Sequence, residues 1–222
     1  MANGLFVTAT GTDVGKTYIS ALLVKALRRC GRNAGYYKPI VSGAPAYAHS
    51  DAAYVNDTAG LNERENMLLS YRYSLPAAPH LAARVEGNPP EKSRILRDWH
   101  RVCTAYDYVT AEGCGGILCP IRMDEQHSWY VTDLIGWLSL PSVIVVPAGL
   151  GAINAAALTA FYMTACRLPV KGYIVNEYTG TMIEKDTICQ IEKLTSLPVW
   201  TCVKRGDTEL HLTEEELLSL YQ

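Results

Sequence analysis

Short apolar runs alternate with segments of helical period along most of this 222-residue chain. A short apolar run is typical of a buried strand, whereas apolar residues three and four positions apart indicate a helix. The pattern predicts strands at 4–9, 33–40, 106–111, 142–146, 171–176 and 198–202. It predicts helices at 16–30, 51–55, 80–86, 91–105, 132–140, 155–166 and 183–194, and a last short helix that begins at 213.

The regular alternation of strands and helices favours one architecture. Strands that are joined through helices generally run parallel, and the helices then cover both faces of the sheet. We therefore expect an α/β fold with a mostly parallel, doubly wound sheet. The sequence has no internal repeat, no low-complexity segment and no clear linker, so we predict a single domain over residues 1–222.

Composition narrows the class of protein. Hydrophobic residues make up 49% of the chain and charged residues 19%, which is ordinary for a compact enzyme. The net charge of −2 gives no support for nucleic acid or an anionic membrane as a partner. No apolar run approaches the ~18 residues of a spanning helix, and no signal peptide precedes the first strand, so we expect a cytoplasmic protein. The seven cysteines show no disulfide or zinc framework and are interpreted as reduced structural thiols.

The first strand, its loop and the next helix follow the order of a phosphate-binding loop. Gly15-Lys16-Thr17 opens the helix, where backbone N–H groups, the helix dipole and the lysine charge attract an anion. The Thr17 hydroxyl would face a magnesium ion carried with the phosphates. The match is incomplete, because Thr10 stands where the standard pattern has its first glycine. The alternative is a strand-to-helix turn that uses the backbone freedom of Gly15.

Polar side chains recur at the ends of other predicted strands. Lys38 ends the second strand, which is predicted to stop at the following proline, and Glu112 begins a glycine-rich turn after the third. Asn154 and Asn176 follow the next two strands, and Asp51 lies thirteen residues beyond Lys38. Ligands bind outside the carboxyl ends of parallel strands, so these groups are expected to meet a nucleoside triphosphate and its metal. By itself, Lys38 is equally consistent with a solvent-facing lysine.

With these residues in view, the chain resembles the dethiobiotin synthetases of biotin biosynthesis over nearly its whole length. The most specific likeness lies in Lys38-Pro39-Ile40-Val41-Ser42-Gly43 and in the turn Leu150-Gly151-Ala152-Ile153-Asn154. The phosphate loop alone does not separate this family from the other P-loop NTPases. Further segments that resemble the family are 10–17, 50–52, 78–80, 112–116 and 175–176.

The resemblance implies an ATP-dependent ring closure with Mg²⁺. In the family, CO2 adds to one amine of 7,8-diaminononanoate, and the resulting carbamate attacks the γ-phosphate of ATP. The second amine then displaces phosphate, which closes the cyclic urea of dethiobiotin. The resemblance also implies a homodimer, because the neighbouring subunit binds the carboxylate of the substrate.

Residue roles follow from the resemblance by position. Two lysines stabilise charge on the carbamate and on the transferring phosphate, and two hydroxyls hydrogen-bond them. The implied catalytic residues are Lys16, Lys38, Thr12 and Ser42, and the implied metal ligands are Thr17, Asp51 and Glu112. The nucleotide and its metal are implied to contact Asp13, Val14, Gly15, Lys16, Thr17, Tyr18, Asp51, Glu112, Gly115 and Asn176, the last at the base. The substrate is implied to contact Ser42 and, through its carboxylate, Gly151, Ala152, Ile153 and Asn154.

Several positions depart from the pattern of the family. Ala9 replaces a glycine and Gly11 replaces an aspartate, so the loop has its glycine in another place and one carboxylate fewer near the lysines. Cys114 replaces a small apolar residue, and Gly149 stands where a basic residue is common. The segment 203–207 does not resemble the proline-containing segment that closes over adenine, which leaves the base preference open.

Other classes of protein share parts of this pattern. Partitioning and positioning ATPases similar to ParA and MinD have a signature lysine at the position of Gly11, which is absent here. Amide-forming ligases related to the cobyrinate synthetases normally add a glutaminase domain, for which 222 residues leave no room. A nucleotide-binding domain with altered or lost activity is a third alternative, because of the altered loop.

Overall fold

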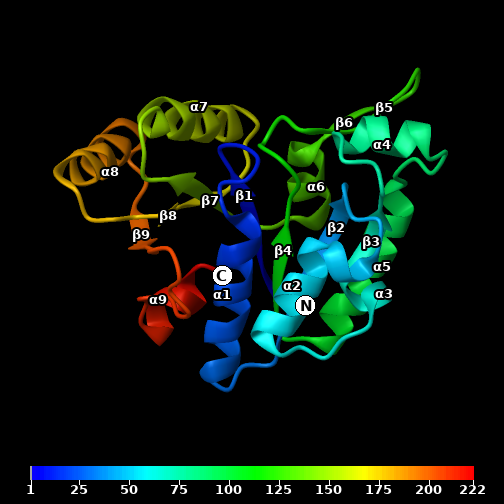
Figure 1. Ribbon diagram of the computed structural model, residues 1–222, viewed down its shortest axis with the longest axis horizontal. Coiled ribbons are helices and arrows are strands. Elements are labelled where there is room, and N and C mark those ends of the chain that lie inside the picture. Colours follow the sequence, from blue (N-terminus) through cyan, green and yellow to red (C-terminus); the bar gives the residue numbers. More distant parts are fainter. Residues whose placement is uncertain (1) are drawn as a thin grey trace.

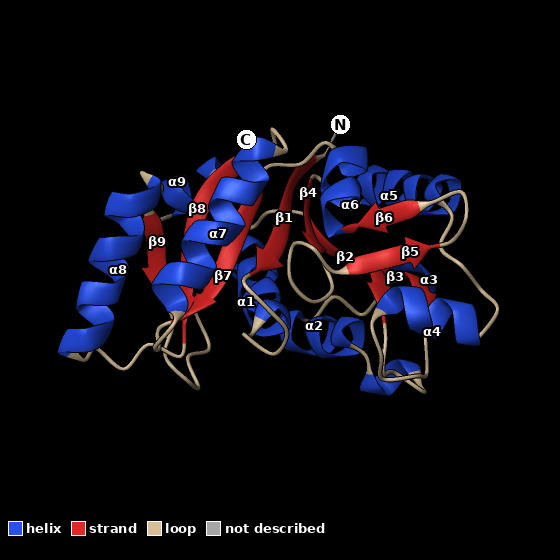
Figure 2. Ribbon diagram, turned by 90° about the horizontal axis from the view of Figure 1, so that it is seen from above, coloured by secondary structure: helices blue, strands red, loops and turns tan. Residues whose placement is uncertain are grey.

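The computed structural model describes residues 2–222, which fold into a central sheet with helices on either side (Figure 1). The strands of the sheet are β1 (Asn3–Ala9), β2 (Ala34–Val41), β3 (Leu69–Arg72), β4 (Tyr108–Glu112), β7 (Ser142–Pro147), β8 (Val170–Asn176) and β9 (Val199–Cys202). Among the described residues these seven strands pair in the order β3-β2-β4-β1-β7-β8-β9, always parallel. Figure 2 shows the strands side by side. The predicted parallel α/β architecture is confirmed.

Helices cover both faces of this sheet. One face carries α5 (Lys92–Ala105), α6 (Val131–Leu138), α7 (Ala152–Ala165) and α8 (Met182–Thr195). The other face carries α1 (Lys16–Arg29), α2 (Asp51–Ala59) and α9 (Glu214–Ser219). The shorter elements are η1 (Tyr47–His49), α3 (Glu65–Leu68), α4 (Pro79–Val85) and the antiparallel hairpin of β5 (Pro120–Met123) and β6 (Ser128–Tyr130).

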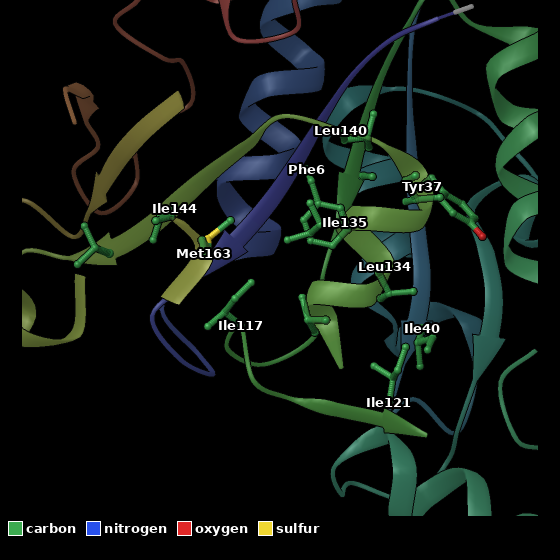
Figure 3. Close-up of a cluster of buried hydrophobic side chains, with 14 of the residues drawn as sticks. Phe6, Tyr37, Ile40, Ile117, Ile121, Leu134, Ile135, Leu140, Ile144 and Met163 are labelled. Atoms are coloured by element: carbon green, nitrogen blue, oxygen red, sulfur yellow. The ribbon is translucent and has the colours of Figure 1, made fainter. Parts of the chain in front are cut away.

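Successive side chains of a strand point to opposite faces of the sheet, so the hydrophobic core has one part on each face. On β1, Phe6 packs in the core beneath α5 to α8, whereas Leu5 and Val7 pack beneath α1 and α9. All three side chains are fully buried, as a sheet covered on both faces requires. Figure 3 shows Phe6 beside Ile135 of α6 in the larger core. The strand that leads into the phosphate loop is therefore packed against helices on both faces of the sheet.

Strand β2 corrects one prediction. It does not stop at Pro39 but continues to Val41, so Lys38 lies inside the strand rather than at its end. The pairing of β2 with β4 ends at Tyr37, and the register with β3 passes over Pro39. The proline has no N–H to donate, but at this position the ladder requires none. The prediction was wrong because it considered the proline without its neighbouring strands.

Two features of the middle of the chain were not predicted. Strand β3 is a four-residue edge strand in a region for which the sequence pattern predicted neither a helix nor a strand. The hairpin of β5 and β6 follows the glycine-rich turn after β4 and lies outside the main sheet.

Among residues 2–222, no helix combines the length and the apolarity that crossing a membrane requires. The cysteines of the described chain are all free thiols, as predicted.

Replacing Phe6 by alanine tests the role of the larger core. Phe6→Ala is expected to lower the free energy of unfolding by about 3–5 kcal/mol, because it leaves a cavity in a fully buried cluster. Chemical denaturation measures this loss. Leu194→Ala is the control, because Leu194 at the end of α8 is 52% exposed, and surface changes usually stay within about 0.5 kcal/mol. Equal losses in the two variants would contradict this account of the core.

Candidate active site

The phosphate loop between β1 and α1 ends at Gly15, whose backbone is left-handed with a φ of 95°. A Cβ at this position would come within 2.0 Å of Asn176 Nδ2. That nitrogen donates to the carbonyl oxygen of Val14 at 3.1 Å, so the end of β8 is joined to the loop. Both the backbone conformation and the available space therefore require glycine at position 15.

The displaced glycine of the loop, Gly11, is under no such requirement. Its φ is not positive, and an added Cβ would only reach Val14 Cγ1 at 4.0 Å. Its carbonyl oxygen accepts a hydrogen bond from Lys16 Nζ at 2.8 Å. Burial lowers the pKa of Lys16, and the nearby charge of Lys38 lowers it further. The loop thus keeps its conformation through Gly15 and holds Lys16 over its own backbone.

Lys38 is the centre of a group of charges in which Lys38 and Glu112 are buried, whereas the side chain of Asp51 is 38% exposed. Its Nζ lies 2.6 Å from Glu112 Oε1 and 2.6 Å from Asp51 Oδ2, and it also donates to the carbonyl oxygen of Gly113 at 2.9 Å. Lys38 is 2% exposed and Glu112 is fully buried. These residues come from β2, from the end of β4 and from the start of α2. The structure therefore brings together three predicted site residues that are far apart in the sequence.

Neighbouring charges keep Lys38 and Asp51 ionised. Burial by itself lowers the pKa of Lys38, but the carboxylates of Glu112 and Asp51 raise it well above its usual range. The ammonium of Lys38 in turn holds the pKa of Asp51 below its usual value, against the opposing effect of burial. Lysine and carboxylate are therefore both charged at neutral pH.

Glu112 receives hydrogen bonds at both carboxylate oxygens. Thr17 Oγ1 donates to Oε1 at 2.8 Å, which places the first turn of α1 against the charged group. Tyr36 donates through its hydroxyl to Oε2 at 2.7 Å. The sequence did not point to Tyr36, although its position two residues before Lys38 on a strand was a usable signal, because such residues share a face.

A cavity of about 1040 Å³ opens beside these groups. This volume is at the upper end of the ~300–1,000 Å³ of ligand pockets. The predicted residues that line it are Thr12, Asp13, Gly15, Lys16, Thr17, Tyr18, Lys38, Ser42, Asp51, Glu112 and Gly115. Lining residues that the sequence did not single out as site residues include His49, Ser50, Tyr54 and Cys119.

Ser42 is the least satisfied polar group of the cavity wall. Its Oγ is buried, yet it has no hydrogen-bond partner within the part of the chain that the structure describes. Buried hydroxyls in proteins nearly always have a partner. A hydroxyl without a partner at the wall of a cavity is therefore available to a ligand.

Six predicted site residues do not line the cavity. Val14 and Asn176 bond to each other behind the loop, as described above. The start of α7 lies outside the cavity, and Leu150 beside it is 97% exposed. The residues outside the cavity are Val14, Asn176, Gly151, Ala152, Ile153 and Asn154.

The charged group has the donor atoms that magnesium prefers. Asp51 and Glu112 supply carboxylate oxygens, and Thr17 supplies a hydroxyl that bonds to Glu112. Mg²⁺ typically takes one or two carboxylates and completes its shell with water and substrate phosphates. Residues 2–222 contain no group of three or more His, Cys, Asp or Glu side chains that suits a metal. The residues therefore fit an ion that arrives with a nucleotide better than one bound by protein alone.

The chain is similar to a known protein family and to named proteins over nearly its whole length. A model described as an AAA domain matches residues 3–208. The ATP-dependent dethiobiotin synthetase BioD of Brachyspira hyodysenteriae is 40% identical over 223 residues, which cover 100% of both chains. The protein of the same name from Clostridium botulinum (strain Alaska E43) is 38% identical over 226 residues, which cover 100% of this chain and 99% of the relative.

Solved structures share the fold at much lower identity. The MinC:MinD complex of Aquifex aeolicus matches with a TM-score of 0.57 at 14% identity, over 92% of this chain and 82% of that one. The receptor FtsY of Elizabethkingia anophelis matches with a TM-score of 0.59 at 15% identity, over 100% and 64%. A ParA family ATPase of Chlorobium tepidum matches with a TM-score of 0.54 at 16% identity, over 99% and 91%. These likenesses establish a P-loop NTPase-like fold and no more.

Replacing Gly15 by alanine tests the geometry of the loop. Gly15→Ala is expected to weaken ATP binding about tenfold or more, since the loop must shift away from Asn176, and each ~1.4 kcal/mol is a factor of ten. Isothermal titration calorimetry measures the affinity. Gly31→Ala is the matched control, because Gly31 also has a positive φ of 72° but has open space around it. It should lose only stability, and unchanged ATP affinity in Gly15→Ala would contradict the assignment.

Proposed function

Because the chain belongs to the family of ATP-dependent dethiobiotin synthetases, we propose that its cavity carries out the ATP-dependent ring closure of 7,8-diaminononanoate. The observation that carries this proposal is the buried position of Lys38 between Glu112 and Asp51, in the same cavity as Lys16 and the phosphate loop. Two fixed ammonium groups beside a nucleotide site suit a reaction that builds negative charge on oxygen.

The proposed reaction proceeds in three steps. One amine of the substrate adds to CO2 and gives a carbamate. A carbamate oxygen attacks the γ-phosphorus of ATP, which releases ADP and leaves a carbamic-phosphoric anhydride. The second amine attacks the carbonyl carbon, phosphate leaves, and the cyclic urea closes. Overall, the diamine, CO2 and ATP become dethiobiotin, ADP and phosphate.

The roles of the catalytic residues follow from their positions. Lys16 and Lys38 stabilise the negative charge of the carbamate and of the transferring phosphoryl group. Both are held in place before the substrates bind, so little reorganisation is needed during the reaction. Thr12 and Ser42 hydrogen-bond the carbamate or its phosphate, and the Ser42 hydroxyl, which lacks a partner within residues 2–222, is free to do so.

The nucleotide is bound by the loop and by the first turn of α1. The backbone N–H groups there, together with the dipole of α1, attract the phosphates. Thr17, Asp51 and Glu112 would hold Mg²⁺, which would neutralise charge on the phosphates. Asp13, Gly15, Lys16, Tyr18 and Gly115, which line the cavity, are proposed to surround the nucleotide. Val14 and Asn176 lie outside the cavity, where they bond to each other, and are proposed to contact the nucleotide beyond its wall, Asn176 at the base.

The substrate carboxylate is bound at the start of α7 of a second copy of the chain. Gly151, Ile153 and Asn154 present N–H groups there, at the positive end of a 14-residue helix, whereas the N–H of Ala152 between them donates to the carbonyl oxygen of Gly149 at 3.2 Å. Large apolar side chains nearby are exposed: Leu118 by 51%, Leu158 by 60% and Phe161 by 50%. Exposed apolar patches of this kind mark interaction surfaces. A homodimer that joins these faces would cover them and complete the site.

A second, apolar hollow supports this arrangement. It has a volume of about 600 Å³, and its lining residues include Leu118, Leu158 and Phe161. Cys119 lines both this hollow and the polar cavity. The alkyl chain of the substrate is proposed to lie in this hollow, beside Cys119, and to extend from there toward the proposed dimer face.

The test of the function is an assay with the purified protein. Diamine-dependent release of phosphate is measured, and mass spectrometry detects the cyclic urea. ATP turnover that is indifferent to the diamine would contradict the proposal and favour a nucleotide-switched ATPase.

Lys38→Met, which preserves the length of the side chain, is expected to lower kcat by about 10²–10³, as loss of a group that stabilises transition-state charge does. Nucleotide affinity should remain largely intact, and circular dichroism verifies the fold. Full activity in this variant would remove Lys38 from the mechanism.

Replacing Phe161 by glutamate tests the proposed dimer. Phe161→Glu is expected to raise the dissociation constant of the dimer about a hundredfold or more, since it buries an unpaired charge that costs ~3 kcal/mol. Light scattering after gel filtration measures the oligomeric state. The diamine reaction should be lost with the dimer, while ATP binding remains. Leu194→Glu is the control, because Leu194 on α8 is similarly exposed, at 52%. A wild-type monomer that is fully active would refute the shared site.

A further inference from the structure

Tyr36 reaches the candidate metal ligands from the interior of the protein rather than from the cavity. Its side chain is fully buried and does not line the cavity. Its hydroxyl donates to Glu112 Oε2 at 2.7 Å, and within residues 2–222 this is the one hydrogen bond that the hydroxyl makes. The tyrosine hydroxyl is the donor of this bond and the carboxylate oxygen is its acceptor.

The two oxygens of Glu112 have different kinds of partner. Oε1 accepts from Thr17 at 2.8 Å and from Lys38 at 2.6 Å, and both of these residues line the cavity. Oε2 accepts from Tyr36, which does not. The last torsion of a glutamate is broad and roughly two-fold, so the carboxylate turns unless it is held. Thr17 and Lys38 hold Oε1 from the side of the cavity and Tyr36 holds Oε2 from behind, so the three donors together keep the carboxylate in one orientation, with Oε1 toward the cavity.

The backbone and the core explain the position of Tyr36. Residues two apart on a strand point to the same face, so Tyr36 and Lys38 leave β2 on one side and both reach Glu112. The ring of Tyr36 belongs to the core cluster that contains Val24 of α1 and Val55 of α2. Close packing in such a cluster fixes the ring and therefore also its hydroxyl.

We propose that Tyr36 is a positioning residue that fixes the orientation of Glu112 as a ligand for the magnesium ion bound with ATP. The inference rests on the proposed function, which is what gives Glu112 a metal to bind. Mg²⁺ requires near-ideal octahedral geometry with oxygens at about 2.0–2.1 Å, so a carboxylate that turns freely binds it less tightly. Hydrogen-bond partners behind a metal ligand typically contribute about 10–100-fold to metal affinity.

The experiment compares Tyr36→Phe with Tyr37→Phe, because each variant loses one buried hydroxyl and keeps the aromatic ring. Tyr37 is 1% exposed. Its hydroxyl lies 2.6 Å from Ser70 Oγ and donates to the carbonyl oxygen of Ile95 at 3.1 Å, away from Glu112. Isothermal titration calorimetry measures the Kd of adenylyl imidodiphosphate, a non-hydrolysable ATP analogue, without Mg²⁺ and with saturating Mg²⁺. The ratio of the two constants is the gain in affinity that the ion provides.

Tyr36→Phe is expected to lower this gain about tenfold and to leave the affinity without Mg²⁺ unchanged. Tyr37→Phe should change neither quantity. An equal gain in the wild type and in Tyr36→Phe would overturn the proposal. So would an equal decrease in both variants, which would indicate a general effect on the core. A wild-type protein that gains nothing from Mg²⁺ would refute the metal assignment itself, and the role of Tyr36 with it.

A second comparison tests whether Tyr36 acts through Glu112. Glu112→Gln removes the charged ligand, so adding Tyr36→Phe to this variant should cause no further loss of the gain from Mg²⁺. Non-additivity of this kind is expected for residues that share one interaction. A further tenfold loss in the double variant would show that Tyr36 acts by another route, and the proposal would be wrong.

Discussion

A lysine that is buried between two carboxylates is the constraint on which the rest of this structure depends. Lys38 of β2 lies 2.6 Å from both Glu112 of β4 and Asp51 of α2. Breaking a buried ion pair by removing one partner costs about 3–5 kcal/mol, because a charge is left without compensation. The three segments are thus held in place by the same charges that the proposed chemistry uses. The positions of β2, β4 and α2 that make these ion pairs are therefore needed both for stability and for the proposed reaction.

The phosphate loop is held by a second constraint, which acts across the sheet. Asn176 ends β8, and β7 lies between β8 and β1, yet its amide bonds to Val14 inside the loop. This amide also occupies the space that a side chain at position 15 would need, in addition to the strain that the positive φ of Gly15 would impose on any other residue. Because the loop is fixed from outside, its N–H groups need not reorganise when phosphates bind. Such preorganisation is the main source of electrostatic stabilisation in enzymes.

The sequence was sufficient for the features that depend on local pattern, and insufficient for those that depend on pairing. Alternating apolar runs and helical periods predicted the parallel sheet, since a buried strand needs little more than its own residues to be recognised. Strand β3 has only four residues, and what makes it a strand is its pairing with β2. Glu112 was found because it ends β4, and Lys38 was found because β2 was predicted, wrongly, to stop beside it. Tyr36 resembles any buried tyrosine, because its partner is 76 positions away.

The polar cavity and the apolar hollow suit different parts of the proposed substrate. The amines have to meet the phosphates in the polar cavity, whereas the alkyl chain gains free energy only where it leaves water, at about 25 cal/mol per Å² of apolar surface. The apolar hollow offers such surface, but residues of its wall, such as Leu158 and Phe161, are at least half exposed. An open hollow removes only part of the chain from water. A second copy that covers this face would therefore contribute to substrate binding twice, through the apolar surface it buries and through the helix start that it brings to the carboxylate.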